Sequence, residues 1–266
     1  MTQSDPGHLA DPRQQRILHA LQARGEVRVM ELAHDLAVTD ETIRRDLKLL
    51  ETRGALRRVH GGAVPATPAR DVSFAQRMSE NAPAKRAIAR ATLDLLGAAR
   101  TLFIDEGSVT LPFAQLLAER RGLSIMTNMP AIADAVGGGD HEVMLTGGML
   151  DRRNMFLRGE MPFAAARSRL FDLTVMGTSG IDPELGVLAN DEEMAALRRL
   201  LAARSSRVVI ATTHLQLGRR APWCAFPLSA AHSIVTDKRP ARTFCDAFAA
   251  AGTLLVVPGD NAVAAA

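Results

Sequence analysis

Seven short apolar runs recur between residues 101 and 257, and longer stretches with helical character separate them. Runs of three or four apolar residues, set apart in this way, are typical of β-strands joined by helical crossovers. Strands that are buried on both faces read as continuous apolar runs, which is the pattern of a parallel sheet. From residue 85 onward we therefore predict an α/β domain with a mostly parallel sheet, whose strands lie at 101–104, 124–126, 143–145, 173–176, 208–210, 233–235 and 254–257.

The length of 266 residues exceeds that of one small module. It accommodates a domain of about 60 residues beside one of about 200. A stretch with Pro65 and Pro68 among small side chains has no periodicity, which is typical of a linker. We therefore predict a first domain at 1–63, a linker at 64–71, a second domain at 72–258 and a flexible tail at 259–266.

The first domain begins with two short predicted helices. Asp11 supplies an N-cap acceptor, Pro12 occupies the first helical position, and Gly25 provides a stop. After an extended piece at 26–29, apolar residues at helical spacing predict a second helix at 30–36. The order of elements up to this point is helix, extended piece and helix.

A third predicted helix has one apolar side and one basic side. Thr39 can cap its start, and Gly54 ends it. Ile43, Leu47 and Leu50 form an apolar stripe that we expect to face inward. The outer faces are then left to Thr42, Arg44, Arg45 and Lys48.

Residues 55–60, which follow this helix, alternate apolar and basic side chains and lead into Gly61 and Gly62. Alternation of this kind predicts a β-strand, and a glycine pair after it predicts a tight hairpin turn. Three helices followed by a hairpin are the element order of a winged helix-turn-helix. We predict this fold for the first domain.

The outer side of the third helix has the side chains that base reading requires. A helix in the major groove needs short or flat polar groups for base edges, and guanidinium groups for guanine or phosphate. The four outer residues meet this need, although a solvated helix face would carry similar charges. The net charge of +3 permits nucleic-acid binding without establishing it. The frame in which these residues stand therefore decides between the two interpretations.

This frame resembles the DeoR family of bacterial regulators. The resemblance lies in residues 29–33, in Thr42-Ile43-Arg44-Arg45-Asp46-Leu47, and in residues 54–63 with their ending Arg58-Val59-His60-Gly61-Gly62-Ala63. It implies that the third helix enters the major groove and that the hairpin is the wing. It also implies that DNA is contacted by Thr42, Arg44 and Arg45, and at its backbone by Lys48, Arg58 and His60. Because phosphate repels a carboxylate, we expect Asp46 to orient an arginine or to cap locally.

In the second domain, polar and glycine-rich segments follow four predicted strands, at 105–110, 127–128, 147–148 and 177–182. Ligands of open α/β sheets bind beyond the carboxyl ends of the strands, so we expect these segments to converge on one pocket. Gly107 and Ser108 can offer backbone amides and a hydroxyl to phosphate, while Asp105 and Asn128 can bond sugar hydroxyls. The alternative is that each glycine turn only ends a strand.

These segments occur in the order seen in the DeoR family, and they look most like its glycerol-3-phosphate repressor branch. The family's effector domain is similar to sugar-phosphate isomerases such as ribose-5-phosphate isomerase, and it senses phosphorylated sugars or related metabolites. Glu193 and His214 join the candidates, although a solvated helix surface and a structural histidine explain them equally well. The predicted effector-binding residues are Asp105, Gly107, Ser108, Thr110, Thr127, Asn128, Gly147, Gly148, Gly177, Ser179, Glu193 and His214.

The chain departs from the family at positions that bear on ligand chemistry. Where family members commonly have Asp-His-Ser-Lys-Phe-Gly, this chain has Thr213-His214-Leu215-Gln216-Leu217-Gly218, so the acid and the cation are missing. Val109 stands where a second hydroxyl residue is usual, and Leu197 where a lysine often stands. The pocket is therefore expected to hold a less highly charged ligand, or to recruit Arg219 or Arg220 for an anion.

Together the two domains predict a DNA-binding regulator that is not an enzyme. The resemblance implies that it is a repressor of carbohydrate or polyol genes that is controlled by a phosphorylated sugar or related metabolite. A symmetric operator would require a homodimer or homotetramer. One alternative is a sugar-phosphate isomerase with an appended DNA-binding domain, against which the neutral Gln216 argues. Another is a DNA-binding protein whose sensor has decayed.

Several other classes of protein are disfavoured by the composition. Cys224 and Cys245 lack CxxC spacing, and the seven histidines lack zinc-site spacing, so we predict no metal and no cofactor. Residues 1–10 are polar, and no run reaches the roughly 18 apolar residues of a membrane span. These features predict a cytoplasmic protein that does not contact membranes.

Overall fold

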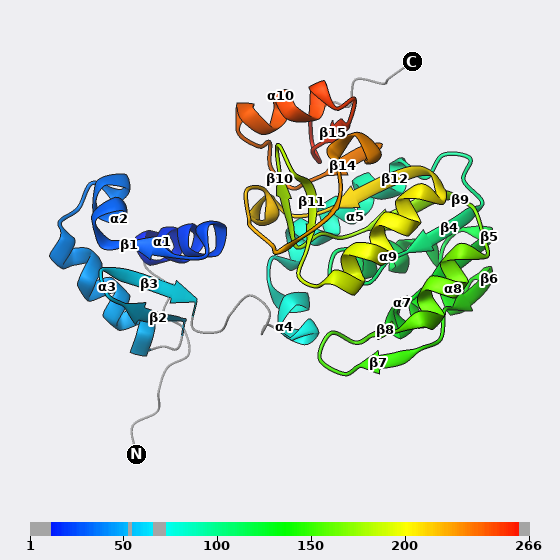
Figure 1. Ribbon diagram of the computed structural model, residues 1–266, viewed down its shortest axis with the longest axis horizontal. Helices are drawn as coiled ribbons and strands as arrows, with labels where there is room; N and C mark the ends of the chain where they lie inside the picture. The colour runs from blue at the N-terminus through cyan, green and yellow to red at the C-terminus, as the bar shows by residue number, and fades with distance from the viewer. Residues whose placement is uncertain (1–11, 53–54, 66–72, 261–266) are drawn as a thin grey trace. The chain divides into compact units, whose positions relative to one another are not determined.

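The computed structural model of the chain describes residues 12–52, 55–65 and 73–260 (Figure 1). It forms two compact units that divide between Val72 and Ser73. The predicted N-cap at Asp11, most of the predicted linker and the last residues of the predicted tail lie outside the described ranges. No helix in those ranges has the length and apolar character needed to span a membrane.

The first unit is a winged helix-turn-helix. Helix α3 follows α2 after a short turn, and β2 and β3 form an antiparallel hairpin after α3. Strand β1 pairs with β3 on its other side, which gives a three-stranded sheet in the order β1-β3-β2. The elements are α1 (Pro12–Arg24), β1 (Val27–Arg28), α2 (Val29–Leu36), α3 (Asp40–Thr52), β2 (Leu56–Val59) and β3 (Gly62–Pro65).

Local signals in the sequence explain where these elements begin and end. Gly25, with φ of 75°, ends α1, and its N–H donates to the carbonyl of Leu21. Thr39 caps α3, because its hydroxyl accepts a hydrogen bond from the backbone N–H of Thr42 at 3.3 Å. Strand β3 extends to Pro65, so two residues that were predicted to lie in the linker belong to the wing.

The second unit is built around a seven-stranded sheet whose strands are all parallel. The seven strands predicted from apolar runs are these seven strands, and the prediction is confirmed. Their order across the sheet is β15-β14-β12-β9-β4-β5-β6. Their bounds are β4 (Thr101–Ile104), β5 (Arg121–Thr127), β6 (Asp140–Leu145), β9 (Phe171–Met176), β12 (Ser205–Ala211), β14 (Ser233–Val235) and β15 (Leu254–Val256).

Helices cover both faces of this sheet, and successive residues of each strand point to opposite faces. On β4, Leu102 and Ile104 face a core shared with α5, α6 and α7, whereas Phe103 faces a core shared with α8, α9 and α10. Burial on both faces explains the apolar runs of the inner strands, whereas the edge strands β6 and β15 are only partly buried. The helices are α4 (Phe74–Ser79), α5 (Ala82–Asp94), α6 (Thr110–Leu117), α7 (Pro130–Gly137), α8 (Glu160–Arg167), α9 (Glu192–Ala203) and α10 (Arg242–Ala250).

Two small antiparallel sheets were not expected from the sequence. One is a hairpin between β6 and α8, and the other pairs β11 with both β10 and β13. These strands have only three or four residues, so they carry too few side chains for a period to be recognised. Their bounds are β7 (Met149–Asp151), β8 (Phe156–Arg158), β10 (Gly180–Asp182), β11 (Gly186–Ala189) and β13 (Trp223–Phe226), and the 3-10 turns are η2 (His214–Gln216) and η3 (Leu228–Ala230).

Candidate functional site

Helix α3 presents a basic outer side, as its periodicity predicts. Ile43, Leu47 and Leu50 are buried in the core of the first unit. The side chains of Arg44, Arg45 and Lys48 are exposed, and Thr42 is half-buried beside the capping Thr39. The four residues assigned to the outer faces are therefore absent from the core, whereas the apolar residues between them fill it.

Asp46 belongs to the core of this unit, although it stands next to two exposed arginines. Its carboxylate accepts from Arg13 Nε at 2.5 Å, from Arg13 Nη2 at 3.2 Å and from Gln14 Nε2 at 3.3 Å. These contacts join α3 to α1 and remove the negative charge from the outer side of α3. Of the two expectations for Asp46, orienting an arginine or capping locally, the contacts support the first, and the arginine is Arg13.

The wing has a turn of two residues, His60 and Gly61, and both glycines that follow His60 have a backbone function. Gly61 has φ of 78°, a conformation that residues with a side chain rarely adopt. A Cβ at Gly62 would lie 2.0 Å from the carbonyl oxygen of Val27, so only glycine allows β1 to approach β3. Arg58 and His60 have exposed side chains on this wing.

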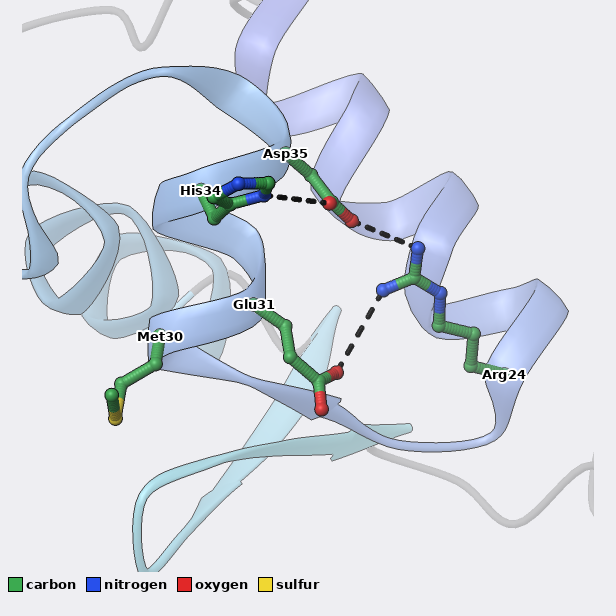
Figure 2. A pocket seen from close by; sticks show the side chains of 5 residues that line it. All are labelled: Arg24, Met30, Glu31, His34 and Asp35. Carbon is green, nitrogen blue, oxygen red and sulfur yellow. Dashed lines mark hydrogen bonds and ion pairs between the residues drawn. The ribbon is translucent and has the colours of Figure 1, made fainter.

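A pocket of about 410 Å³ lies on the same unit, between the end of α1 and α2 (Figure 2). Arg24 bridges its walls, because it contacts Asp35 at 2.9 Å and Glu31 at 3.8 Å. This pairing, first of all the hydrogen bond from Arg24, lowers the pKa of the Asp35 carboxyl. Because these lining charges are exposed, the ion pairs contribute little to stability. We assign no ligand to this pocket.

In the second unit, the crossover connections change direction between β4 and β9, the two central neighbours. From β4 the chain proceeds outward through β5 to β6, and then returns to β9 on the other side of β4. Such a switch point leaves a crevice at the carboxyl ends of the two strands. Gly177, directly after β9, lies beside this point, since a Cβ there would be in ordinary contact with the carbonyl oxygen of Glu106 at 3.9 Å.

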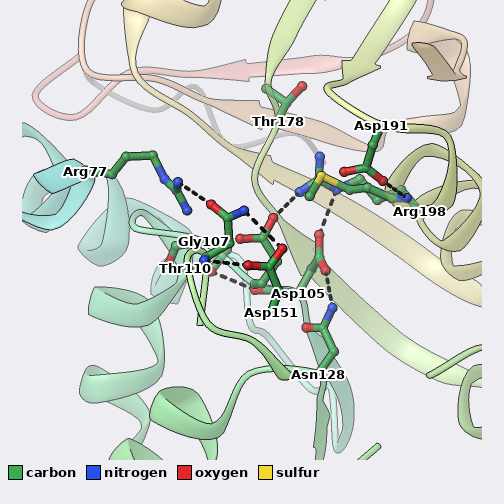
Figure 3. Close-up of polar contacts among 12 residues, drawn as sticks. Arg77, Asp105, Gly107, Thr110, Asn128, Asp151, Thr178, Asp191 and Arg198 are labelled. Atoms are coloured by element: carbon green, nitrogen blue, oxygen red, sulfur yellow. Dashed lines mark hydrogen bonds and ion pairs between the residues drawn. The ribbon is translucent and has the colours of Figure 1, made fainter. Parts of the chain in front are cut away.

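A buried polar network occupies this point (Figure 3). Arg198, on α9, donates from Nε to Asp105 Oδ2 at 2.8 Å and from Nη2 to Glu106 Oε1 at 3.1 Å. Asn128 approaches the same Asp105 carboxylate from the opposite side and donates to Oδ1 at 3.1 Å. Arg198 Nη1 and Asn128 Oδ1 are also buried, and neither has a hydrogen-bond partner among the described residues. The network therefore contains one donor nitrogen and one acceptor oxygen that no described residue engages.

The charges in this network are unequal, since one guanidinium faces two carboxyl groups. Burial raises the pKa of Glu106 to about 7, the Arg198 charge opposes this shift, and the Asp105 charge adds to it. The same two carboxylates raise the pKa of Arg198 against the effect of its burial. Near neutral pH, Glu106 therefore exchanges between its charged and neutral forms.

The loop between β4 and α6 has two backbone N–H groups without an acceptor among the described residues, directly before the start of a helix. The Thr110 hydroxyl donates to the carbonyl of Asp105 at 2.7 Å, which holds the loop against the end of β4. The N–H groups of Gly107 and Ser108 donate to no other group in the described part of the chain. They lie just before α6, where the helix dipole favours negative charge.

Other predicted effector residues are engaged in holding the fold. The Thr127 hydroxyl donates to Ile104 O and accepts from Met129 N, and the N–H of Ser179 donates to Leu188 O. Gly147 and Gly148 have φ of 75° and 117°, and a Cβ at Gly148 would lie 2.5 Å from a backbone oxygen. The glycine pair therefore has a sufficient structural explanation in the turn after β6.

Glu193 and His214 also have protein partners. Glu193 accepts from Arg158 Nη2 at 2.8 Å and from the Gly159 N–H, so it fastens α9 to the end of β8 and is not a solvated helix surface. His214 Nδ1 lies 2.8 Å from Asp237 Oδ2, and its backbone N–H donates to the same carboxylate. The structural alternative for His214 thus has direct support.

The departures from the family pattern have structural counterparts. The hydroxyl of Thr213 donates to Gln216 Oε1, so a neutral hydrogen bond joins the two positions where an acid and a cation are usual. Leu197 is buried in the core shared by α9 and α10, and Val109 packs against the core on the other face. At these two positions the chain has apolar packing in place of polar groups.

Four residues of this region were missed from the sequence: Arg77, Lys85, Glu106 and Arg198. Lys85 is buried and donates to the carbonyl of Arg77, and burial lowers the pKa of Lys85 to about 8. Arg77 donates to Asn154 Oδ1 at 2.8 Å and lies near enough to Glu106 to lower its pKa. The sequence offers only weak signals: Glu106 lies in the polar segment 105–110, and the other three are charged residues within helices, which does not identify a partner.

An exposed basic helix in a winged helix-turn-helix, joined in one chain to an α/β domain with a buried polar site, defines a transcription regulator with a sensor domain. Family comparison agrees: residues 13–69 match a DeoR-like helix-turn-helix domain, and residues 80–238 match the DeoR C-terminal sensor domain. The chain belongs to the DeoR family. In the described ranges, no three His, Cys, Asp or Glu side chains are grouped to hold a metal ion.

Curated relatives resemble the chain over most of its length. The HTH-type transcriptional regulator GlpR of Haloferax volcanii is 34% identical over 209 residues, which cover 78% of this chain and 82% of the relative. The glycerol-3-phosphate regulon repressor of Escherichia coli K12 is 28% identical and covers 84% and 89%. A putative aga operon transcriptional repressor of Escherichia coli O157:H7 is 28% identical and covers 85% and 82%.

Among solved structures, the chain is similar to ribose 5-phosphate isomerase A from Neisseria gonorrhoeae. The identity is 11%, the TM-score is 0.36, and the match covers 51% of this chain and 53% of the isomerase. A match to eIF2B beta from Chaetomium thermophilum has 9% identity and a TM-score of 0.43, and it covers 57% and 48%.

Proposed function

We propose that this regulator represses carbohydrate or polyol genes and that a phosphorylated sugar or related metabolite controls its binding to operator DNA. The observation that carries the proposal is the exposed basic side of α3, held in a winged helix fold on a chain with a polar switch-point site. The names of relatives, a glycerol-3-phosphate regulon repressor and an aga operon repressor, support this class of target genes.

For DNA recognition, we assign direct contacts to Thr42, Arg44 and Arg45, and backbone contacts to Lys48, Arg58 and His60. Arg44 and Arg45 are exposed, while Asp46 is withdrawn onto Arg13, so the outer side of α3 offers positive charge to phosphate and guanine. Two half-sites of a symmetric operator need two recognition helices, so the active species is proposed to be a dimer or a tetramer.

For effector recognition, the polar network suggests two subsites with different chemistry. The N–H groups of Gly107 and Ser108 before α6 suit an anion such as phosphate. Near Asp105 and Glu106 an anion would be repelled, whereas a hydroxyl group can accept from Arg198 Nη1 or donate to Asn128 Oδ1. A ligand with a phosphate at one end and hydroxyl groups at the other satisfies both subsites.

One observation favours an enzyme as the second candidate, namely the pKa of Glu106 near 7, which suits a general acid or base. Against it, Thr213 and Gln216 form a neutral pair, and Glu106 is held by Arg198. Turnover of a pentose phosphate by the full chain would support this candidate. Loss of that turnover in Glu106→Gln would then identify Glu106 as the catalytic group.

DNA recognition is tested by selecting bound sequences from a random DNA library with the full chain. On the selected DNA, at fixed salt, Arg44→Ala with Arg45→Ala should weaken binding at least about 30-fold, because each specific arginine contact contributes roughly 1–3 kcal/mol. Arg120→Ala with Arg121→Ala is the matched control, since this adjacent exposed pair lies in the second unit. Unchanged affinity of the α3 variant, or no enrichment of DNA, would contradict the proposal.

A further inference from the structure

Exposed apolar side chains are concentrated in one short part of the second unit. Six of the thirteen large apolar side chains that are exposed in the described part of the chain lie between residues 144 and 161. Met149 is 70% exposed and Met161 is 58% exposed. We call this set the β6 face, and it consists of Met144, Leu145, Met149, Leu150, Met155 and Met161.

These six residues belong to elements that pack together. Strand β7 pairs with β8, and the N–H of Leu157 on β8 donates to Asn128 O at the end of β5. Helix α8 begins directly after β8, and a Cβ at Gly147 would lie 2.6 Å from Met161 Cε. Figure 1 shows β6 at the outer edge of the sheet, near α8 and the β7–β8 hairpin. The β6 face is therefore a local surface and not a set of scattered residues.

The face also includes an open strand edge. Strand β6 has six residues and pairs with β5 alone, so its outer side has backbone donors and acceptors without a strand partner in the described ranges. The opposite edge strand, β15, has only three residues. Long edges with exposed apolar residues lead to association unless something covers them. Met144 and Leu145, at the carboxyl end of β6, are exposed apolar residues on such an edge.

The charges around the face favour a second copy of the chain over a nucleic acid. Exposed residues of both signs lie on these elements and beside them: Asp140, Glu142 and Glu160 are acidic, and Arg121, Arg152, Arg153 and Arg167 are basic. A nucleic acid would need a strong excess of positive charge, whereas a rim with charges of both signs interspersed can complement itself across a two-fold axis. Methionine side chains also adapt readily when they pack against one another.

We propose that the β6 face is the surface through which two copies of this chain associate. The choice of a second copy rests on the proposed function, because a symmetric operator requires two recognition helices. In a two-fold interface each copy contributes the same residues, so the edges of both β6 strands and both sets of methionines become covered at once.

The test is the mass of the full chain in solution, measured by light scattering after size-exclusion chromatography over a wide range of concentration. The wild type should be a dimer or a larger species. Met149→Asp with Met161→Asp should lower the mass and weaken association at least about 100-fold, because each substitution enters the interface twice. Met30→Asp with Leu185→Asp, at exposed sites that do not belong to the face, should keep the wild-type mass.

Folding of each variant is checked by urea unfolding, which is monitored through Trp223 for the second unit and by circular dichroism for both units. Met149→Lys alone replaces the double face variant if the unfolding midpoint of the double variant falls. A monomeric wild type, an unchanged mass in the face variant, or an equal fall in the control overturns the proposed interface. Binding to the DNA selected from the random library reports on the proposed function separately. A monomer that binds this DNA contradicts the interface alone, and a dimer that binds no DNA contradicts the function alone.

Discussion

Replacing Glu106 with glutamine should remove a pH dependence from the stability of the second unit. Glu106 is 6% exposed, and its carboxyl accepts from Arg198 Nη2 while the same guanidinium also contacts Asp105. Glutamine keeps an oxygen that can accept from Arg198 Nη2, but it does not ionise. The variant therefore isolates the free energy that is associated with the Glu106 proton.

The direction of the effect follows from the raised pKa. Burial, and next to it the Asp105 charge, raises the pKa of Glu106 from 4.5 to about 7, so the folded chain holds this proton more tightly than the unfolded chain. The contribution of the Glu106 proton to the unfolding free energy is complete below pH 4.5, and it is lost as the pH rises through about 7. The full shift corresponds to about 3 kcal/mol, of which about 2 kcal/mol should disappear between pH 5.5 and 8.

Urea unfolding at pH 5.5 and at pH 8 measures this difference. Trp223 is the only tryptophan, and the chain has no tyrosine, so the fluorescence reports on the second unit alone. The unfolding free energy of the wild type, minus that of Glu106→Gln, should fall by about 2 kcal/mol over this range. Glu119→Gln, at an exposed position, is the matched control and should follow the wild type. An equal difference at both pH values would refute the reasoning.

Two further predictions concern Gly62 and Gln216. Gly62→Ala would place a Cβ 2.0 Å from Val27 O and should lower the unfolding free energy of the first unit by at least about 1–3 kcal/mol. Circular dichroism should therefore show that this unit unfolds early. Gly137→Ala, where a Cβ meets no atom within 4 Å, should not have this effect. Inorganic phosphate should stabilise the second unit of Gln216→Lys against unfolding, followed through Trp223, more than it stabilises Gln115→Lys, because Gln216→Lys restores a cation beside the strand ends. Equal stabilisation of the two variants would contradict a phosphate subsite at this position.

The sequence determined the elements of this protein and their arrangement along the chain, because the signals involved are local. Seven apolar runs were enough to predict all strands of the parallel sheet, and for the inner strands this is because a strand covered on both faces needs an unbroken apolar run. The pair Gly61-Gly62 predicted the wing, and the apolar stripe of α3 predicted which of its residues are exposed.

Only the tertiary structure decided which polar residues meet. Arg198 contacts an aspartate 93 positions earlier in the chain, and Asp46 contacts an arginine 33 positions earlier. No local period encodes such a partner, so Glu193 and His214 could not be distinguished from ligand contacts until their own partners were visible. The exposure of β6 likewise depends on the order of the strands, which follows from packing and crossover direction and not from the composition of any one strand.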